Sequence, residues 1–317
     1  MSPLSNDLAG QVREGEVRAL ARAISMVENG HPAAPVLLAA LFPHAGRSLV
    51  VGLTGPPGSG KSTLVDRLTA RLRRDGKTVG IVAVDPSSPF SGGAILGDRI
   101  RMQAHAGDDG VFIRSLATRG HLGGLTAATG QVLTVLAASG KDVILLETVG
   151  VGQGEVEVVD AADVSLVVLG PGLGDEVQAL KAGIMEIADV FVVNKADREG
   201  VDRVVAEIES MLSLGPPGGR PRPVIVKTVA TEDRGVDELW AAVEAFRAEA
   251  DGRGALAARR RGQLRRQLEQ TLQRRLLDRA QARVLTPEEL ERTVDRLESR
   301  RVDPLGAAEE VIKRMGL

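Results

Sequence analysis

One stretch of nine residues constrains the fold more than any other part of the sequence: Gly55-Pro56-Pro57-Gly58-Ser59-Gly60-Lys61-Ser62-Thr63. It follows the apolar run 49–53 and precedes the helical pattern 64–68, so a strand, a glycine-rich loop and a helix are expected in that order. The glycines let backbone N–H groups point at a phosphate, and the helix adds the positive end of its dipole. Lys61 would reach the β- and γ-phosphates, while the Ser62 hydroxyl would bind Mg²⁺. The alternative is a glycine-rich turn without a nucleotide, but every motif position and both flanks match the phosphate-binding loop.

Composition narrows the classes of function that remain. Of 317 residues 43% are hydrophobic but only 2% aromatic, which leaves few stacking platforms for single-stranded nucleic acid. The formal charge of −2 gives no general reason to expect nucleic acid or an anionic membrane as a partner. Cysteine is absent, which excludes disulfides, zinc–thiolate sites and cysteine nucleophiles. Without a recognisable secretory leader or a long apolar span, we expect a soluble, cytoplasmic protein.

From residue 48 onward, apolar runs alternate with helical patterns, which is typical of an α/β fold with a mostly parallel sheet flanked by helices. The expected strands are 49–54, 78–85, 111–115, 143–147, 164–169, 190–194 and 223–228. Two helices are expected before this core, and helices follow it to the end of the chain. We expect an N-terminal helical segment (1–47), a nucleotide-binding domain (48–250) and a C-terminal helical region (251–317). Ligands of such sheets lie beyond the carboxyl ends of the strands.

Acidic residues follow two of these strands. Asp85 ends the strand 78–85, and Asp98 lies in the polar stretch that follows it. Either carboxylate could hold Mg²⁺ directly or through water, although Asp98 alone is equally well explained as a helix N-cap before Arg99. Glu147 ends the strand 143–147 as the acidic residue of a Walker B strand would, and it is a candidate for catalysis as well as for the metal.

Two glycine-rich stretches follow the strands 143–147 and 164–169, and the first of them contains Gly150 and Gln153. The Gly150 N–H is a candidate contact to a γ-phosphate, and the loop could therefore sense whether that phosphate is present. Gln153 could orient the attacking water, or it could be an ordinary surface residue. The second stretch, 170–176, leads to Lys181, a further candidate for catalysis.

The strand 190–194 ends in Asn194-Lys195-Ala196-Asp197, an N-K-x-D pattern. Asp197 could accept hydrogen bonds from N1–H and the 2-amino group of guanine, whereas adenine offers neither donor at these positions. Asn194 would fix the base edge, and the Lys195 stem could cover the ring. The pattern alone is a common turn, but its place after a strand and downstream of the phosphate loop favours GTP. Thr228-Val229-Ala230 could present a backbone N–H to the guanine O6.

The C-terminal region reads as helical. A helix is expected over 235–250, and a charged segment follows from Arg259 to Arg283. Its arginines could indicate nucleic acid. Leucines recur about every four residues, however, which favours an amphipathic helix whose basic face lies in water and whose leucine stripe is packed. Thr286-Pro287 and Asp303-Pro304 are typical helix starts.

Taken together, these motifs resemble the MeaB/MMAA group of P-loop GTPases, also known as ArgK-like proteins. The resemblance extends over nearly the whole chain, and its most specific stretches are 91–98 and 147–153. Members are GTPases that gate cobalamin loading and protect adenosylcobalamin-dependent acyl-CoA mutases, chiefly methylmalonyl-CoA mutase. The resemblance implies that Ser62, Asp85, Asp98 and Glu147 surround Mg²⁺. It also implies a further switch at 175–183, with Lys181 approaching the nucleotide when the mutase binds, and a homodimer formed through the C-terminal region.

We therefore expect a homodimeric, Mg²⁺-dependent GTPase that binds GTP and GDP and serves an acyl-CoA mutase. Two alternatives remain. A small-molecule kinase of the type once inferred for ArgK would use the same phosphate loop, but Asn194 and Asp197 argue against it. A GTPase that delivers nickel is related in mechanism, but the chain has no cysteine and no histidine cluster for carrying metal.

Overall fold

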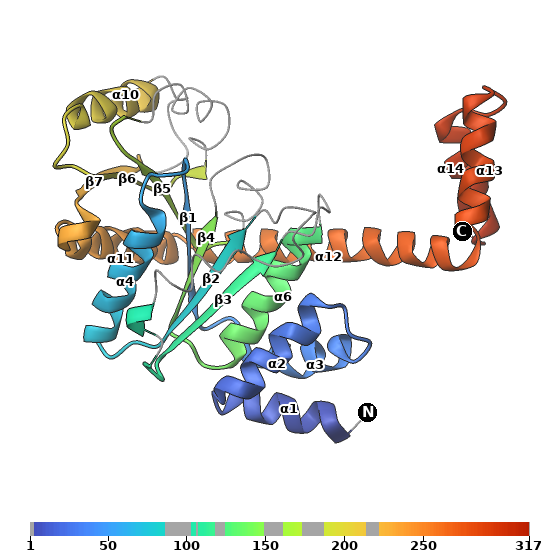
Figure 1. Cartoon of the computed structure of the whole chain (residues 1–317), viewed down its shortest axis with the longest axis horizontal. Coiled ribbons are helices and arrows are strands. Elements are labelled where there is room, and N and C mark those ends of the chain that lie inside the picture. The colour runs from blue at the N-terminus through green and yellow to red at the C-terminus, as the bar shows by residue number, and fades with distance from the viewer. Residues whose placement is uncertain are drawn as a thin grey trace. The chain divides into compact units, whose positions relative to one another are not determined.

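The computed structural model describes residues 3–85, 103–105, 107–117, 124–148, 161–172, 187–213 and 222–316. The chain divides into two compact units, Met1–Gln263 and Leu264–Leu317. The first unit is built around a sheet of seven parallel strands in the order β3-β2-β4-β1-β5-β6-β7 (Figure 1). The strands are β1 (Leu49–Thr54), β2 (Val79–Asp85), β3 (Val111–Ala117), β4 (Val143–Thr148), β5 (Val164–Leu169), β6 (Val190–Asn194) and β7 (Val224–Thr228).

All seven predicted strands are present, and each predicted bound lies within two residues of the observed one. Every residue of β4, β5 and β6 is buried, as expected of parallel strands covered on both faces. The strand β1 lies between β4 and β5, so the phosphate loop that follows it emerges in the middle of the sheet. Glu147, the last residue but one of β4, and the N-K-x-D pattern that begins at the end of β6 therefore lie at the same edge of the sheet.

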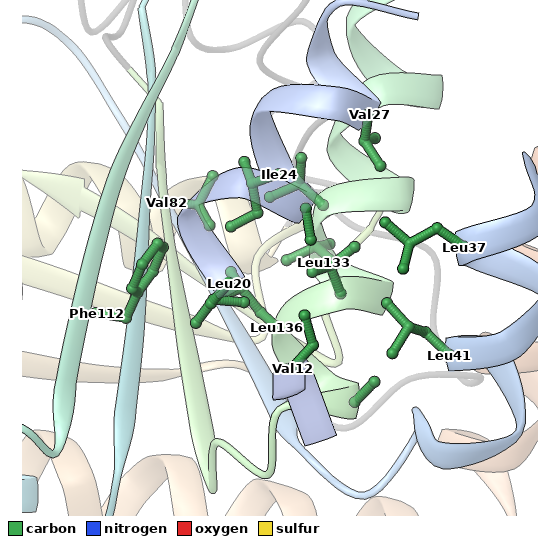
Figure 2. Packing of buried hydrophobic residues seen from close by; sticks show 14 of the residues in the cluster. Val12, Leu20, Ile24, Val27, Leu37, Leu41, Val82, Phe112, Leu133 and Leu136 are labelled. Atoms are coloured by element: carbon green, nitrogen blue, oxygen red, sulfur yellow. The ribbon is translucent and has the colours of Figure 1, made fainter. Parts of the chain in front are cut away.

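One face of the sheet is covered by the helices α1 (Pro3–Arg13), α2 (Val17–Glu28), α3 (Ala34–Leu41) and α6 (Gly124–Ala138). Figure 2 shows Leu20, Ile24 and Leu37 meeting Leu133 of α6, with Val82 and Phe112 contributed by the sheet. The sequence predicted two helices here and missed α1. That helix is short and contains Gly10, and it is fixed by burial of Leu8 and Val12, which lie four residues apart on one side. A short 3₁₀ helix, η1 (Phe42–His44), leads into the sheet.

On the other face lie α4 (Lys61–Arg74) and α11 (Val236–Gly252) (Figure 1). Their leucines and valines pack on β1, β4 and β5. The single tryptophan, Trp240, is buried in this layer. The helix α10 (Val201–Ser213) packs through Val204 and Ile208 on β5 and β6, using the opposite faces of those strands. Two further 3₁₀ helices, η2 (Gln103–His105) and η4 (Ala230–Glu232), lie in loops.

The remaining helices are α12 (Ala255–Arg283), α13 (Pro287–Glu298) and α14 (Pro304–Arg314). Thr286 and Asp303 cap α13 and α14 as predicted: the Thr286 hydroxyl accepts a hydrogen bond from the Glu289 N–H, and the Asp303 carboxylate accepts two. Within the residues that the structure describes, the leucine stripe of α12 is not packed as expected: Leu264, Leu268 and Leu272 are 49%, 68% and 54% exposed. In the part of the chain that the structure describes, no helix combines the length and the apolar character needed to cross a membrane.

Candidate functional site

The phosphate loop is the backbone between β1 and α4. Gly55 and Gly60 both have positive φ angles, +139° and +93°, and both lie against other parts of the site. A Cβ atom on Gly55 would lie 2.1 Å from the backbone oxygen of Val168, and one on Gly60 would lie 2.3 Å from Asn194 Nδ2. Glycine is therefore required here by close packing as well as by conformation.

Lys61 begins α4 and is 5% exposed. Its Nζ donates to the backbone oxygens of Gly55 (2.7 Å) and Pro56 (3.0 Å), which draws the ammonium group back over the loop. This position is consistent with a lysine that serves a phosphate bound in the loop, since the cation is held inside the curve of the backbone.

Ser62 and Glu147 come together beside the loop, as the sequence predicted. The Ser62 hydroxyl donates to Glu147 Oε1 at 2.6 Å, and the Glu147 side chain is buried. A hydroxyl and a carboxylate are both hard oxygen donors, which is the chemistry that Mg²⁺ prefers. These two residues therefore fit a magnesium site; among the described residues, no group of three or more His, Cys, Asp or Glu could hold a metal.

Five other predicted site residues lie wholly or partly outside the part of the chain that the structure describes. Asp85 ends β2, the neighbour of β4 in the sheet, so its backbone lies at the same edge as Glu147; its side chain is outside the described part. Four further predicted residues lie outside the described residues: Asp98, Gly150, Gln153 and Lys181. For these, the predicted roles remain predictions.

The N-K-x-D pattern lies in the turn after β6, next to the phosphate loop. Asn194 is 2% exposed, and its Nδ2 donates to the Ser59 backbone oxygen at 2.9 Å. Its Oδ1 accepts from the Thr228 hydroxyl and the Ala230 N–H, each at 3.1 Å. One side chain thus ties together the phosphate loop and the loop after β7.

Lys195 and Asp197 occupy the exposed part of the same turn. Lys195 has a φ angle of +59°, and its Nζ donates to the Gly58 backbone oxygen at 2.5 Å. Asp197 is exposed two residues later, where its carboxylate is available to a base. In the loop after β7, the Val229 N–H donates to Arg234 O and the Ala230 N–H donates to Asn194 Oδ1, so both N–H groups proposed for the guanine O6 have a partner within the chain.

Some supporting contacts were not predicted. The helix α4 holds the segment after β7 through two ion pairs, Arg74–Asp233 at 3.2 Å and Arg71–Asp237. Thr54 and Thr148 join the ends of β1 and β4 by a buried hydrogen bond between their hydroxyls. The sequence offers no local signal for either, since the partners lie far apart along the chain.

Comparisons with known proteins find a matching family and several relatives. A family model described as "Methylmalonyl Co-A mutase-associated GTPase MeaB" matches residues 20–284. A Pyrococcus abyssi protein named as a GTPase is 44% identical over 98% of this chain and 96% of its own length. The GTPase ArgK of Escherichia coli is 39% identical over 82% of each chain. The mouse protein named methylmalonic aciduria type A homolog, mitochondrial, is 37% identical over 79% of this chain and 65% of its own length.

Among solved structures, the fold is similar to a crystal structure described as an LAO/AO transport system kinase. The TM-score is 0.75 with 27% identity, and the match covers 100% of this chain and 99% of the other.

Proposed function

This chain belongs to the MeaB family of GTPases, and we propose that it uses Mg²⁺-dependent hydrolysis of GTP to gate cobalamin loading of an adenosylcobalamin-dependent acyl-CoA mutase and to protect that enzyme. Methylmalonyl-CoA mutase is the partner we propose, because the matching family is named for its association with that enzyme. The observation that carries the nucleotide assignment is Asn194, which bonds the phosphate loop at Ser59 and the loop after β7 at Ala230. The loop that binds the phosphates and the loops that bind the base would then be held in fixed positions relative to each other by Asn194.

Each residue has a proposed role in hydrolysis by in-line attack of water. Lys61 and the loop N–H groups stabilise the negative charge that spreads over the transferring phosphoryl group. Ser62 and Glu147 would hold Mg²⁺, with Asp85 and Asp98 completing the set. When bound, the ion supplies further neutralisation of phosphate charge. Gly150, Gln153 and Lys181 are proposed to contact the γ-phosphate, the water and the nucleotide, respectively.

We expect slow hydrolysis by the chain alone and faster hydrolysis with the mutase present. No arginine or glutamine in the described part of the chain is placed to complete the site, so a partner that repositions the surrounding loops should add catalytic groups. The test measures phosphate release from GTP with and without purified methylmalonyl-CoA mutase. Equal rates would exclude gating through hydrolysis. Lys61→Ala is the control, because it should abolish both nucleotide binding and any effect of the mutase.

We further propose that the chain forms a homodimer through its C-terminal helices, with functional regions 1–47, 48–250 and 251–317. Support comes from the exposed leucines of α12, which no other part of the described chain covers.

A kinase activity is the second candidate, because the similar crystal structure is described as a transport system kinase. Such an enzyme would transfer phosphate from ATP to an acceptor. Competition of ATP and GTP for the site separates the two proposals, since the contacts expected of Asp197 favour guanine.

A further inference from the structure

We infer that Gly170, the residue directly after β5, is a positioning residue that sets how strongly the site selects guanine over other purines. This inference rests on the proposed binding of guanine at Asn194 and Asp197. Gly170 acts through the backbone of Asn194 and through the turn that Asn194 begins.

The space beside Gly170 explains why a glycine stands there. Gly170 is buried, and a Cβ atom built on it would lie 3.1 Å from the Asn194 backbone oxygen and 3.9 Å from Lys195 Cδ. Its φ angle is not in the left-handed region, so the backbone itself would accept alanine. The absence of a side chain at this position therefore reflects the close approach of Asn194.

Asn194 is poorly able to move away from an added methyl group. Its side chain makes three hydrogen bonds, to Ser59, Thr228 and Ala230. Its backbone pairs with Thr228 in the register of β6 and β7, and Ala196, two residues further on, donates its N–H to the Thr228 backbone oxygen at 3.0 Å. Because these bonds hold Asn194 from several directions, an added methyl group on residue 170 should displace the turn 195–197 rather than the Asn194 side chain.

That turn carries the residue expected to read the base. Lys195 adopts a φ angle of +59° and is tethered to Gly58 O, and Asp197 follows two residues later. Two hydrogen bonds from guanine to one carboxylate demand accurate placement, because a hydrogen bond weakens steeply when its angle departs from linear. A small shift of the turn should therefore weaken the hydrogen bond between Asp197 and the 2-amino group of guanine more than it weakens binding of the phosphates.

The end of β5 also supports the phosphate loop. Val168 lies two residues before Gly170, and its backbone oxygen lies 2.1 Å from the position that a Cβ atom on Gly55 would take. The last residues of β5 are thus in contact with the loops for the phosphates and for the base. Through this strand end, the position of one loop is fixed relative to the other.

The test compares GDP with IDP, whose base lacks the 2-amino group, by calorimetry on the full chain. We expect Gly170→Ala to weaken GDP about tenfold and IDP about threefold, so that the ratio of the two affinities falls about threefold. Gly172→Ala is the matched control. Gly172 has a φ angle of +84° and no atom within 4 Å of its Cβ position, so alanine strains the backbone without touching Asn194.

Folding is followed separately through the thermal midpoint and the fluorescence of buried Trp240. A wild-type ratio in folded Gly170→Ala, or an equal fall in Gly172→Ala, would overturn the inference. Failure of wild-type protein to prefer GDP over ADP would instead overturn the proposed nucleotide assignment.

A second variant covers the case in which Gly170→Ala does not fold. Lys195→Ala removes the tether to Gly58 O and should let the turn shift more easily. Lys195→Ala alone should therefore lower the ratio of GDP to IDP affinity, because Asp197 is then less accurately placed. A wild-type ratio in Lys195→Ala would contradict the dependence of base selection on the position of this turn.

Discussion

Asp197 is an exposed carboxylate in the turn after β6, and we propose that its chemistry sets which purine the site selects. An ionised carboxylate only accepts hydrogen bonds, which suits the N1–H and 2-amino donors of guanine. An amide side chain both donates and accepts, which suits xanthine, where an oxygen replaces the 2-amino group.

We therefore expect Asp197→Asn to weaken GDP binding roughly 100-fold and to strengthen binding of XDP. Calorimetry with both nucleotides measures the change, and Asp202→Asn, on α10, serves as a control. A variant that keeps the wild-type preference for GDP would show that Asp197 does not read the base.

Among the helices, α12 has two arginines in its second turn, Arg259 and Arg260, whose contacts differ from those that the sequence predicted. Arg259 makes a bidentate contact with Asp189, at 2.6 and 2.9 Å, and Arg260 one with Asp163, at 2.7 and 2.8 Å. Both aspartates are buried, and each also accepts a backbone N–H of a neighbouring strand. The prediction of a solvated basic face is wrong for these two arginines; they hold α12 to the amino ends of β5 and β6.

The ion pair between Arg259 and Asp189 should be important for stability. Asp189→Asn leaves a largely buried guanidinium group without its charged partner, so we expect the free energy of unfolding to fall by about 3 kcal/mol. Asp202→Asn is the control, since the Asp202–Lys227 pair is exposed and should change stability by less than about 0.5 kcal/mol. Urea denaturation of both variants provides the comparison. Equal losses would show that burial does not strengthen the pair at α12.

A second element, the start of β3, is held to α4 by a contact that depends on pH. The Arg73 guanidinium beside Asp108 lowers the pKa of that carboxyl group, with help from the Gly110 N–H. A pKa lowered by folding means that the contact stabilises the protein fully above about pH 3.9, the ordinary value, and that this stabilisation is lost as pH falls through the lower folded value.

Asp108→Asn should therefore lower the urea midpoint at pH 7, and the gap to wild type should narrow as the pH drops below about 4. Asp109→Asn, a change at the exposed neighbouring residue, is the control. A gap that stays constant down to acid pH would mean that the effect of the substitution does not come from the charge of Asp108.

The sequence predicted elements better than it predicted their contacts. Apolar runs such as 164–169 identify buried strands because every residue in them must leave water. By contrast, the pairing of Arg259 with Asp189 joins residues 70 positions apart, and nothing near either one distinguishes a buried ion pair from a surface charge. The motifs placed Ser62 near Glu147 correctly. Gly170 carried no signal, because its role depends on a carbonyl group brought close only by the fold.

At the scale of the whole molecule, the second unit, Leu264–Leu317, exposes many large apolar side chains to solvent. Its two short helices are joined by ion pairs, Arg296–Glu310 and Arg314–Glu289, rather than by a buried core. No residue of α13 is buried. The leucines of α12 at 264, 268, 272, 276 and 277 are all exposed by 38% or more. Such a surface is typical of an interface, since monomers rarely leave large apolar patches in water.

Association of two copies would cover these leucines. Burying the exposed half of each side chain contributes on the order of 1 kcal/mol, hence roughly 10 kcal/mol for two copies, against an association cost of about 4 to 15 kcal/mol. The leucines alone give at best a marginal dimer, and Leu290, Val294 and Leu305 on α13 and α14, which are also exposed, should contribute as well.

Substituting two leucines of α12, Leu268→Glu with Leu272→Glu, should therefore weaken the dimer strongly, and adding Leu305→Glu should leave a monomer at micromolar concentration. Sedimentation velocity across a concentration series measures this. Val17→Glu, on the exposed face of α2, is the control. Because none of the residues proposed to bind the nucleotide is changed, basal GTP hydrolysis should be the same in monomer and dimer. A wild-type chain that sediments as a monomer at high concentration would require another partner for this surface.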